Sequence, residues 1–165
     1  MPSLWRLYRT RHGPGLDGIG GMFAGGRWHT QGQRVVYFGG SAAIVVLERL
    51  AHADPDLLPS DLQLARFEFP EPVPETKVEE FAALPANWTR YEDATRRIGG
   101  QWRRRGSSCI LAVPSAILPE ESNFVLNPEH PDAKRLRLVR ARRFTFDPRV
   151  PSSGQPSVTR LSKIT

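Results

Sequence analysis

Alternating and helical patterns of apolar residues divide the first half of the chain into short elements. Residues 4–8 alternate apolar and polar side chains and predict a first strand, and residues 34–38 predict a second. Between them, residues 11–26 hold seven glycines and one proline, so we expect a loop that bends sharply or approaches another group closely. Ser41 is placed to cap a helix that runs to about Ala53.

The second half of the chain predicts further strands around one helix. Residues 62–69 predict a strand, residues 88–104 a helix, and the wholly apolar run 107–113 a buried strand. Prolines punctuate residues 114–131, which we expect to be irregular, and residues 136–146 predict a last strand with one basic edge. Strands outnumber helices and do not alternate regularly with them, so the sequence favours an α+β fold.

Length and composition favour one folded domain. The chain has 165 residues, of which 39% are hydrophobic, enough to build one core. We expect residues 1–147 to form this domain and residues 148–165, rich in proline and serine, to be a flexible C-terminal tail. A single cysteine excludes an internal disulfide framework, and no apolar run suits a signal peptide or a membrane span, so we expect a cytoplasmic protein.

The predicted helix after Ser41 carries informative polar residues. Its apolar side chains cover nearly the whole circumference, so we expect the helix to be buried. The remaining stripe holds Ser41, Glu48 and His52, although a buried helix needs neither a carboxylate nor an imidazole. The stripe therefore either is a satisfied polar pair or an edge exposed to solvent, or it lines a cleft. In the second case Glu48 presents a negative charge there and His52 orients it or contacts a ligand.

An arginine and a tyrosine precede this helix. Arg27 follows Gly25-Gly26, which permits close backbone approach, and its guanidinium either forks onto a phosphate or ribose or stacks on the neighbouring tryptophan. Tyr37 ends the second strand, where its ring either packs in the core or stacks on a flat heterocycle. Arg6 and Arg9 on the first strand offer a second anion contact. Together these residues suggest a site for an anionic, ring-bearing ligand.

The charge of the chain adds polyanions to the candidate partners. The formal net charge is +6, which suits nucleic acid, a dinucleotide or an acidic protein. The basic clusters at 96–97, 103–105 and 134–143 are typical of solvated faces and, apart from Trp102, lack interleaved aromatic residues, so they indicate single-strand binding only weakly. The histidines have no metal-ligand spacing, and P-loop, HExxH and GxSxG motifs are missing, so we expect no metal.

Six segments, in order along the chain, match short motifs of a known family. They are Leu7-Tyr8-Arg9, Gly25-Gly26-Arg27-Trp28, Val35-Val36-Tyr37, Leu47–His52, Leu111–Ser115 and Ser122–Pro131. Each is weak alone, but the ordered set is specific and resembles the RES-domain family, the toxin half of bacterial RES–Xre toxin–antitoxin pairs, over roughly residues 4–146. The family is named for an arginine, a glutamate and a serine, which here match Arg27, Glu48 and Ser122. His29 stands where an asparagine is common in the family.

This resemblance implies a fold similar to that of ADP-ribosyltransferases, with a split β-sheet core and flanking helices, and NAD⁺ as the substrate. Family members either destroy NAD⁺, with water or phosphate as acceptor, or attach ADP-ribose to a protein, and both alternatives stay open here. The partner implied is an Xre-like helix-turn-helix antitoxin. A basic nucleic-acid-binding module is the alternative from a different class. The resemblance and the residue patterns together assign catalytic roles to Glu48, Arg27 and Tyr37 and NAD⁺ contacts to Arg9, Arg27, Tyr37, His52 and Ser122.

Overall fold

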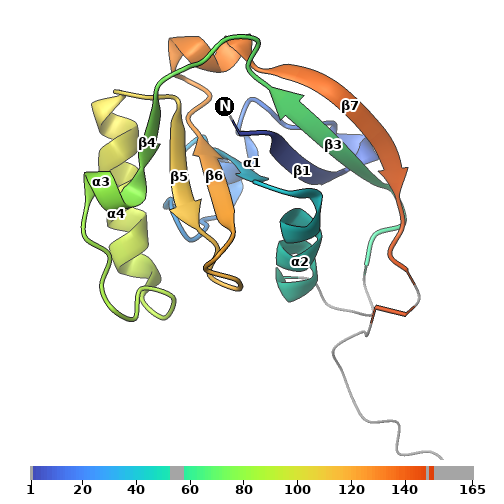
Figure 1. Ribbon diagram of the computed structural model, residues 1–165, viewed down its shortest axis with the longest axis horizontal. Helices are drawn as coiled ribbons and strands as arrows, with labels where there is room; N and C mark the ends of the chain where they lie inside the picture. Colours follow the sequence, from blue (N-terminus) through green and yellow to red (C-terminus); the bar gives the residue numbers. More distant parts are fainter. Residues whose placement is uncertain (1, 53–57, 148, 151–165) are drawn as a thin grey trace, which may run out of the picture.

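The strands form one mixed sheet (Figure 1). The computed structural model describes residues 2–52, 58–147 and 149–150. Within these residues the strands are β1 (Leu4–Arg9), β2 (Val36–Gly39), β3 (Leu62–Glu68), β4 (Glu75–Lys77), β5 (Ile110–Pro114), β6 (Ser122–Leu126) and β7 (Arg137–Phe144). The helices are α1 (Gly20–Phe23), α2 (Ala42–His52), α3 (Val78–Phe81) and α4 (Glu92–Arg105), with 3-10 turns at Thr10–His12 and Pro131–Arg135.

The sheet is split near its middle. Its strand order is β4-β5-β6-β2-β1-β3-β7, and every neighbouring pair is antiparallel except β4 and β5. The two central strands, β1 and β2, share one paired position, Trp5 with Gly39, and then diverge. A Cβ at Gly39 would lie 2.5 Å from the Ile44 side chain, so glycine is needed for α2 to pack against this junction. The divergence leaves room for a cleft between the two halves.

Two apolar clusters hold the sheet from opposite faces. One contains Ile110 and Leu126, together with Phe38 and Phe67, which meet edge to face. The other contains Leu111 and Val125, because successive side chains of β5 and β6 point to opposite faces. The wholly apolar run around β5 is thus buried on both sides, as its sequence predicts.

The structure confirms the predicted N-cap of α2 but not the predicted burial of this helix. The Ile44 N–H donates to Ser41 Oγ at 3.2 Å, which satisfies one unpaired amide at the start of the helix. Ile44 is nevertheless the only residue of this helix that is fully buried, and Leu47 is 36% exposed. The prediction of a buried helix is therefore wrong. Helix α2 covers the sheet with one side, and its other side borders a cleft and solvent.

Three further elements differ from expectation. Strand β6 lies in the segment 114–131 predicted to be irregular, and it is a central strand between β5 and β2. Short β4 and α3 follow the proline-rich connector after β3.

The proposed tail lies outside the described residues except for residues 149–150. Among the helices that are described, none has the length and apolar character needed to span a membrane.

Candidate active site

A cleft of about 670 Å³ opens where the sheet divides. Its walls come from β1, the glycine-rich loop, β2, α2 and the ends of β5 and β6. Of the residues predicted from the sequence, Arg27, Tyr37, Glu48 and His52 line this cleft. Arg9 and Ser122 do not. The structure thus brings together residues that are far apart in the chain, around one concave surface large enough for a ligand of nucleotide size.

Two neutral hydrogen-bond donors fix the carboxylate of Glu48. Its Oε1 accepts from Asn123 Nδ2 at 2.6 Å and from Ser115 Oγ at 2.9 Å. The fully buried Ser115 hydroxyl oxygen also accepts the N–H groups of Ile117 and Leu118, so its single proton is directed at Glu48. Oε2 forms no hydrogen bond to a described residue and remains available to a ligand.

His52 contacts the Glu48 backbone rather than orienting the carboxylate. Its Nδ1 donates to the Glu48 carbonyl oxygen at 2.8 Å, which fixes the tautomer with the proton on Nδ1. The same nitrogen lies 3.8 Å from Glu48 Oε2, and 74% of the His52 side chain is exposed. In the structure Ser115 and Asn123, rather than His52, donate hydrogen bonds to the Glu48 carboxylate, and His52 stands at the rim of the cleft.

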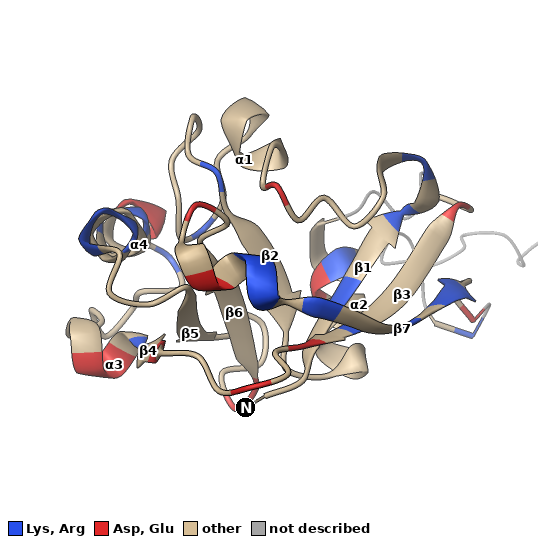
Figure 2. Cartoon of the chain, turned by 90° about the horizontal axis from the view of Figure 1, so that it is seen from above, with Lys and Arg blue, Asp and Glu red and all other residues tan. Residues whose placement is uncertain are grey.

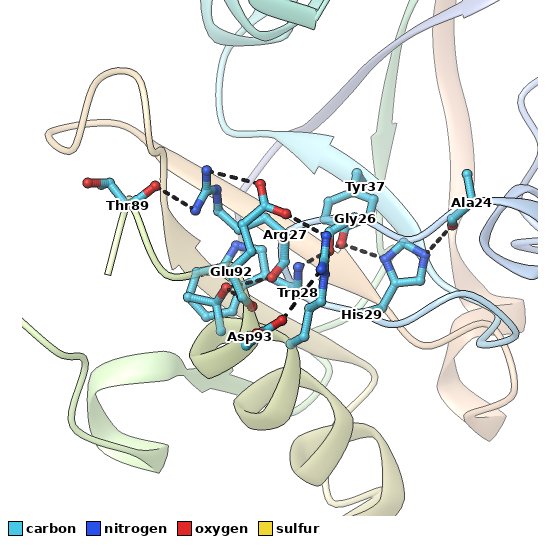
Figure 3. A network of polar contacts seen from close by, with 11 residues as sticks. Ala24, Gly26, Arg27, Trp28, His29, Tyr37, Thr89, Glu92 and Asp93 are labelled. Carbon is cyan, nitrogen blue, oxygen red and sulfur yellow. Dashed lines mark hydrogen bonds and ion pairs between the residues drawn. The ribbon is translucent and has the colours of Figure 1, made fainter. Parts of the chain in front are cut away.

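Arg27 is held in a polar network at one end of the cleft (Figure 3). Its Nη1 donates to the Thr89 carbonyl oxygen at 3.0 Å, and its Nη2 lies 3.6 Å from Glu92 Oε1. The guanidinium sits 5.8 Å from the ring centre of Trp88, which replaces the expected stacking on Trp28. Arg96 donates a hydrogen bond from Nη2 to the same Glu92 carboxylate, and its Nε donates to the Gly26 carbonyl oxygen. Glu92 thus joins two arginines beside the glycine pair.

Tyr37 belongs to a hydrogen-bonded chain whose proton positions are determined by its ends. The Ala24 carbonyl oxygen can only accept, so His29 Nε2 carries a proton and donates to it at 3.0 Å. His29 Nδ1 then accepts from the Tyr37 hydroxyl at 2.8 Å, and the Tyr37 oxygen accepts the Trp28 N–H at 3.1 Å. Burial lowers the pKa of His29 and raises the pKa of Tyr37, so both side chains are neutral, as this chain requires.

Arg6 is the cation that the structure places in the cleft from β1. Its Nε donates to the Pro14 carbonyl oxygen at 2.7 Å and its Nη1 to that of Tyr37 at 2.8 Å. Burial lowers its pKa to about 10, which leaves the side chain charged at neutral pH. No described carboxylate forms an ion pair with Arg6, so its remaining N–H donors suit an anionic ligand.

The structure places two of the predicted ligand contacts, Arg9 and Ser122, outside the lining of the cleft. Arg9 pairs with Asp61 at 2.8 Å at the far end of β1 and lies outside the cleft. Ser122 is exposed at the start of β6, where its carbonyl oxygen accepts the Gly40 N–H. The serine that reaches Glu48 is Ser115, and β5–β6 pairing brings it near Asn123. Ser115 and Asn123 both lie in the motif segments matched above. Their closeness to Glu48 depends on the pairing of β5 with β6, and β6 was not predicted from the sequence.

The described residues hold no group of three or more histidine, cysteine, aspartate or glutamate side chains that could bind a metal ion. The side chains described above are one fixed carboxylate, cations at two positions and an aromatic ring around an open cleft. The cations and the aromatic ring can bind an anionic ligand that carries a flat ring, and the carboxylate can stabilise positive charge that develops on that ligand.

Comparisons with known proteins identify the family that the chain resembles in sequence. The family described as RES domain matches residues 3–147. The "Prs ADP-ribosylating toxin" of Sphingobium sp. is 36% identical over 155 residues, covering 90% of this chain and 96% of that protein. A "Toxin Res" of Pseudomonas putida is 35% identical over 149 residues, covering 89% of this chain and 98% of its own length.

A solved structure shares the fold at low sequence identity. It is a chain from the crystal structure of the Mycobacterium tuberculosis MbcT-MbcA toxin–antitoxin complex, with a TM-score of 0.69 and 16% identity. The match covers 87% of this chain and 84% of that one. This similarity confirms the α+β fold predicted from the sequence.

Proposed function

The chain belongs to the RES-domain family, and from this membership and the geometry of the cleft we propose that it is the toxin of a toxin–antitoxin pair, acting in the cytoplasm on NAD⁺. It cleaves the nicotinamide–ribose bond and transfers ADP-ribose to an acceptor protein, with residues 1–147 as the catalytic domain. The observation that carries this proposal is the Glu48 carboxylate, fixed through Oε1 by Ser115 and Asn123, with Oε2 free in a cleft that also holds Arg6.

One carboxylate can promote this bond cleavage. The nicotinamide ring of NAD⁺ carries the positive charge, so it takes the bonding electron pair and leaves as a neutral base without a general acid. Positive charge then develops on the ribose, as in other glycosyl transfers, and Oε2 of Glu48 stabilises it at short range. Because Ser115 and Asn123 occupy Oε1, the carboxylate is oriented before the reaction and does not reorganise during it.

The remaining cleft residues bind and position the substrate. The diphosphate of NAD⁺ is anionic, and Arg6 offers a charged guanidinium without a described carboxylate partner. Arg27 contributes from the glycine-rich segment after exchanging its contact with Glu92 for the ligand. The Tyr37 ring, held through His29, flanks the flat nicotinamide.

The acceptor of the ADP-ribose group and the protein partner of this chain complete the proposal. Transfer to a protein is supported by the similarity to the ADP-ribosylating toxin of Sphingobium sp., whereas water or phosphate as acceptor defines an NAD⁺-depleting alternative. An antitoxin partner is supported by the toxin–antitoxin complex that shares the fold, and we propose the Xre-like type for it. An acidic segment of that antitoxin would block the cleft near Arg27 and Arg6, whereas Arg9 is already paired with Asp61 outside the cleft.

Mass spectrometry of the reaction products tests the acceptor directly. The protein is incubated with NAD⁺ alone, with added phosphate, and with a bacterial lysate. ADP-ribose attached to protein in the lysate supports the proposal, whereas free ADP-ribose or ADP-ribose phosphate as the main product in all three mixtures supports the NAD⁺-depleting alternative. If none of these products forms, but the protein retards DNA or RNA in a salt-dependent manner, the basic binding module is the better explanation.

A further inference from the structure

Strand β7 is a long open edge of the sheet. It pairs with β3, and no other described strand lies on its outer side (Figure 1). Residues 137–143 are all exposed, so neither face of the strand is covered by described residues. The opposite edge, β4, has three residues, whereas β7 has eight. An edge of this length presents a row of backbone N–H and C=O groups that can pair with another strand.

The edge strand carries uncompensated positive charge. Four arginines fall within β7, and Figure 2 shows them as blue stretches along the strand: Arg137, Arg140, Arg142 and Arg143. None of them forms an ion pair with a carboxylate in the described part of the chain. Arg137 donates to the backbone carbonyl of Lys134, and the Arg142 guanidinium lies 5.7 Å from the Phe144 ring centre. By contrast, Arg66 on the neighbouring strand is paired with Glu68.

Positive charge and apolar surface occur on both faces of this strand. Arg142 pairs in register with the buried Leu64, whereas Arg143 pairs with Gln63, so the two arginines project to opposite faces. Leu138 and Val139 are 52% and 49% exposed between the charged positions. A partner that satisfies both faces and the backbone groups between them has the geometry of another strand, whose side chains also alternate. A nucleic acid offers phosphates but no row of amide groups.

We propose that β7 binds an extended acidic segment of a partner protein, which adds to the sheet as a further strand. The partner carries carboxylates at positions that meet the arginines and apolar side chains beside Leu138 and Val139. A second copy of this chain is disfavoured at the same edge, because two arginine-rich strands would place like charges opposite each other. This surface is separate from the cleft, so the inference does not depend on the proposed function.

The probe for this surface is a synthetic peptide of alternating glutamate and valine, long enough to span β7. Binding is measured by fluorescence anisotropy at several salt concentrations, and the contact is located from backbone amide NMR shifts. We expect shifts along β7 and an affinity that falls as salt rises. The same peptide with alternate backbone amides methylated keeps its charge but cannot pair as a strand, so it should bind at least about tenfold more weakly.

Matched charge reversals separate a local surface from a general charge effect. Arg140→Glu with Arg142→Glu should weaken binding by at least about tenfold, since two attractive contacts become repulsive. Arg97→Glu with Arg104→Glu makes the same change in net charge on exposed positions of α4, at the other end of the sheet, and should leave binding within about twofold.

Three results would overturn the proposal. One is failure of the peptide to bind at low salt, and another is equal affinity for the peptide and its methylated form. The third is tighter binding of a single- or double-stranded oligonucleotide of matched charge, lost in the β7 variant, which would make the strand a nucleic-acid surface. The comparison of the two peptides uses the unmodified protein, so it remains decisive even if the β7 variant fails to fold.

Discussion

At the scale of single residues, the orientation of Glu48 depends on a serine that is not the one suggested by the order of motifs. Ser115 Oγ lies 2.9 Å from Glu48 Oε1, whereas Ser122 is exposed at the start of β6. We predict that Ser115→Ala lowers the rate of NAD⁺ cleavage about tenfold or more, because a charge-assisted hydrogen bond is lost. Ser122→Ala should leave the rate unchanged. Initial rates of nicotinamide release decide between the serines, and the reverse order of effects would contradict this site.

A second pair of residues tests which arginine of β1 contacts the substrate. Arg6 lines the cleft, while Arg9 is engaged with Asp61. Arg6→Lys keeps the charge but loses the planar fork, so it should weaken NAD⁺ binding about tenfold. Arg9→Lys should change affinity less than about twofold. Titration calorimetry on a Glu48→Gln background measures both without turnover, and equal affinities in the two lysine variants would remove Arg6 from the binding site.

His29 makes the stability of the folded protein depend on pH. Its pKa is lowered in the folded protein, mainly by burial and also by Arg96, so the unfolded chain binds the proton more readily. This side chain therefore contributes its full stabilisation above its unfolded pKa of about 6.5, and the contribution is lost as pH falls from there through the folded-state pKa. Urea unfolding between about pH 5 and 8 should show this loss. His29→Asn should flatten the curve, and a curve of the same slope in the variant would contradict the assignment.

At the scale of elements, α4 positions the cleft through a close approach. A Cβ at Gly99 would lie 1.9 Å from the Trp28 carbonyl oxygen, in the segment that carries Arg27. We predict that Gly99→Ala destabilises the protein by about 2 kcal/mol or more and weakens NAD⁺ binding, because α4 must move away from this segment.

The next residue supplies a matched control for this contact. A Cβ at Gly100 would meet the Arg104 side chain at 3.4 Å, and that flexible side chain can move. Gly100→Ala should therefore be neutral or stabilise the protein by up to about 1 kcal/mol, because alanine favours the helix. Thermal unfolding measures both variants. Equal destabilisation would show that helix packing in general, rather than the approach to Trp28, decides the outcome.

The elements also show where sequence patterns succeed and fail. Strands β1, β3 and β5 and the capped α2 lie where periodicity or apolar character predicts them, and β7 lies at its predicted place although both of its faces are exposed. Strand β6 escapes prediction because prolines flank a short segment, although its backbone hydrogen bonds lie in the middle of the sheet. The burial of α2 is overestimated because its apolar circumference serves a cleft wall as well as the core. Tertiary pairing, which no local pattern contains, decided both cases.

At the scale of the whole molecule, the divergence of β1 and β2 explains how the candidate site forms. Glu48, Tyr37 and Arg27 occur in the order and neighbourhood that the sequence suggested, and the split sheet brings them to one cleft. The partners that orient Glu48 come from the end of β5 and from β6, 67 and 75 residues further along the chain, so sequence spacing could not select Ser115 over Ser122. Local motifs thus identify the chemistry, and the fold selects which neighbours serve it.

The rate of nicotinamide release from NAD⁺ tests directly whether the Glu48 carboxylate promotes cleavage of the nicotinamide–ribose bond. The measurement compares the unmodified protein with Glu48→Gln, which keeps the shape of the side chain but removes its charge, and with Glu79→Gln, at an exposed position of α3, as a matched control. We predict release by the unmodified protein and by Glu79→Gln, and a rate about 10²–10³ lower for Glu48→Gln with an unchanged unfolding temperature. Full activity of Glu48→Gln, or no release by the unmodified protein, would contradict this prediction.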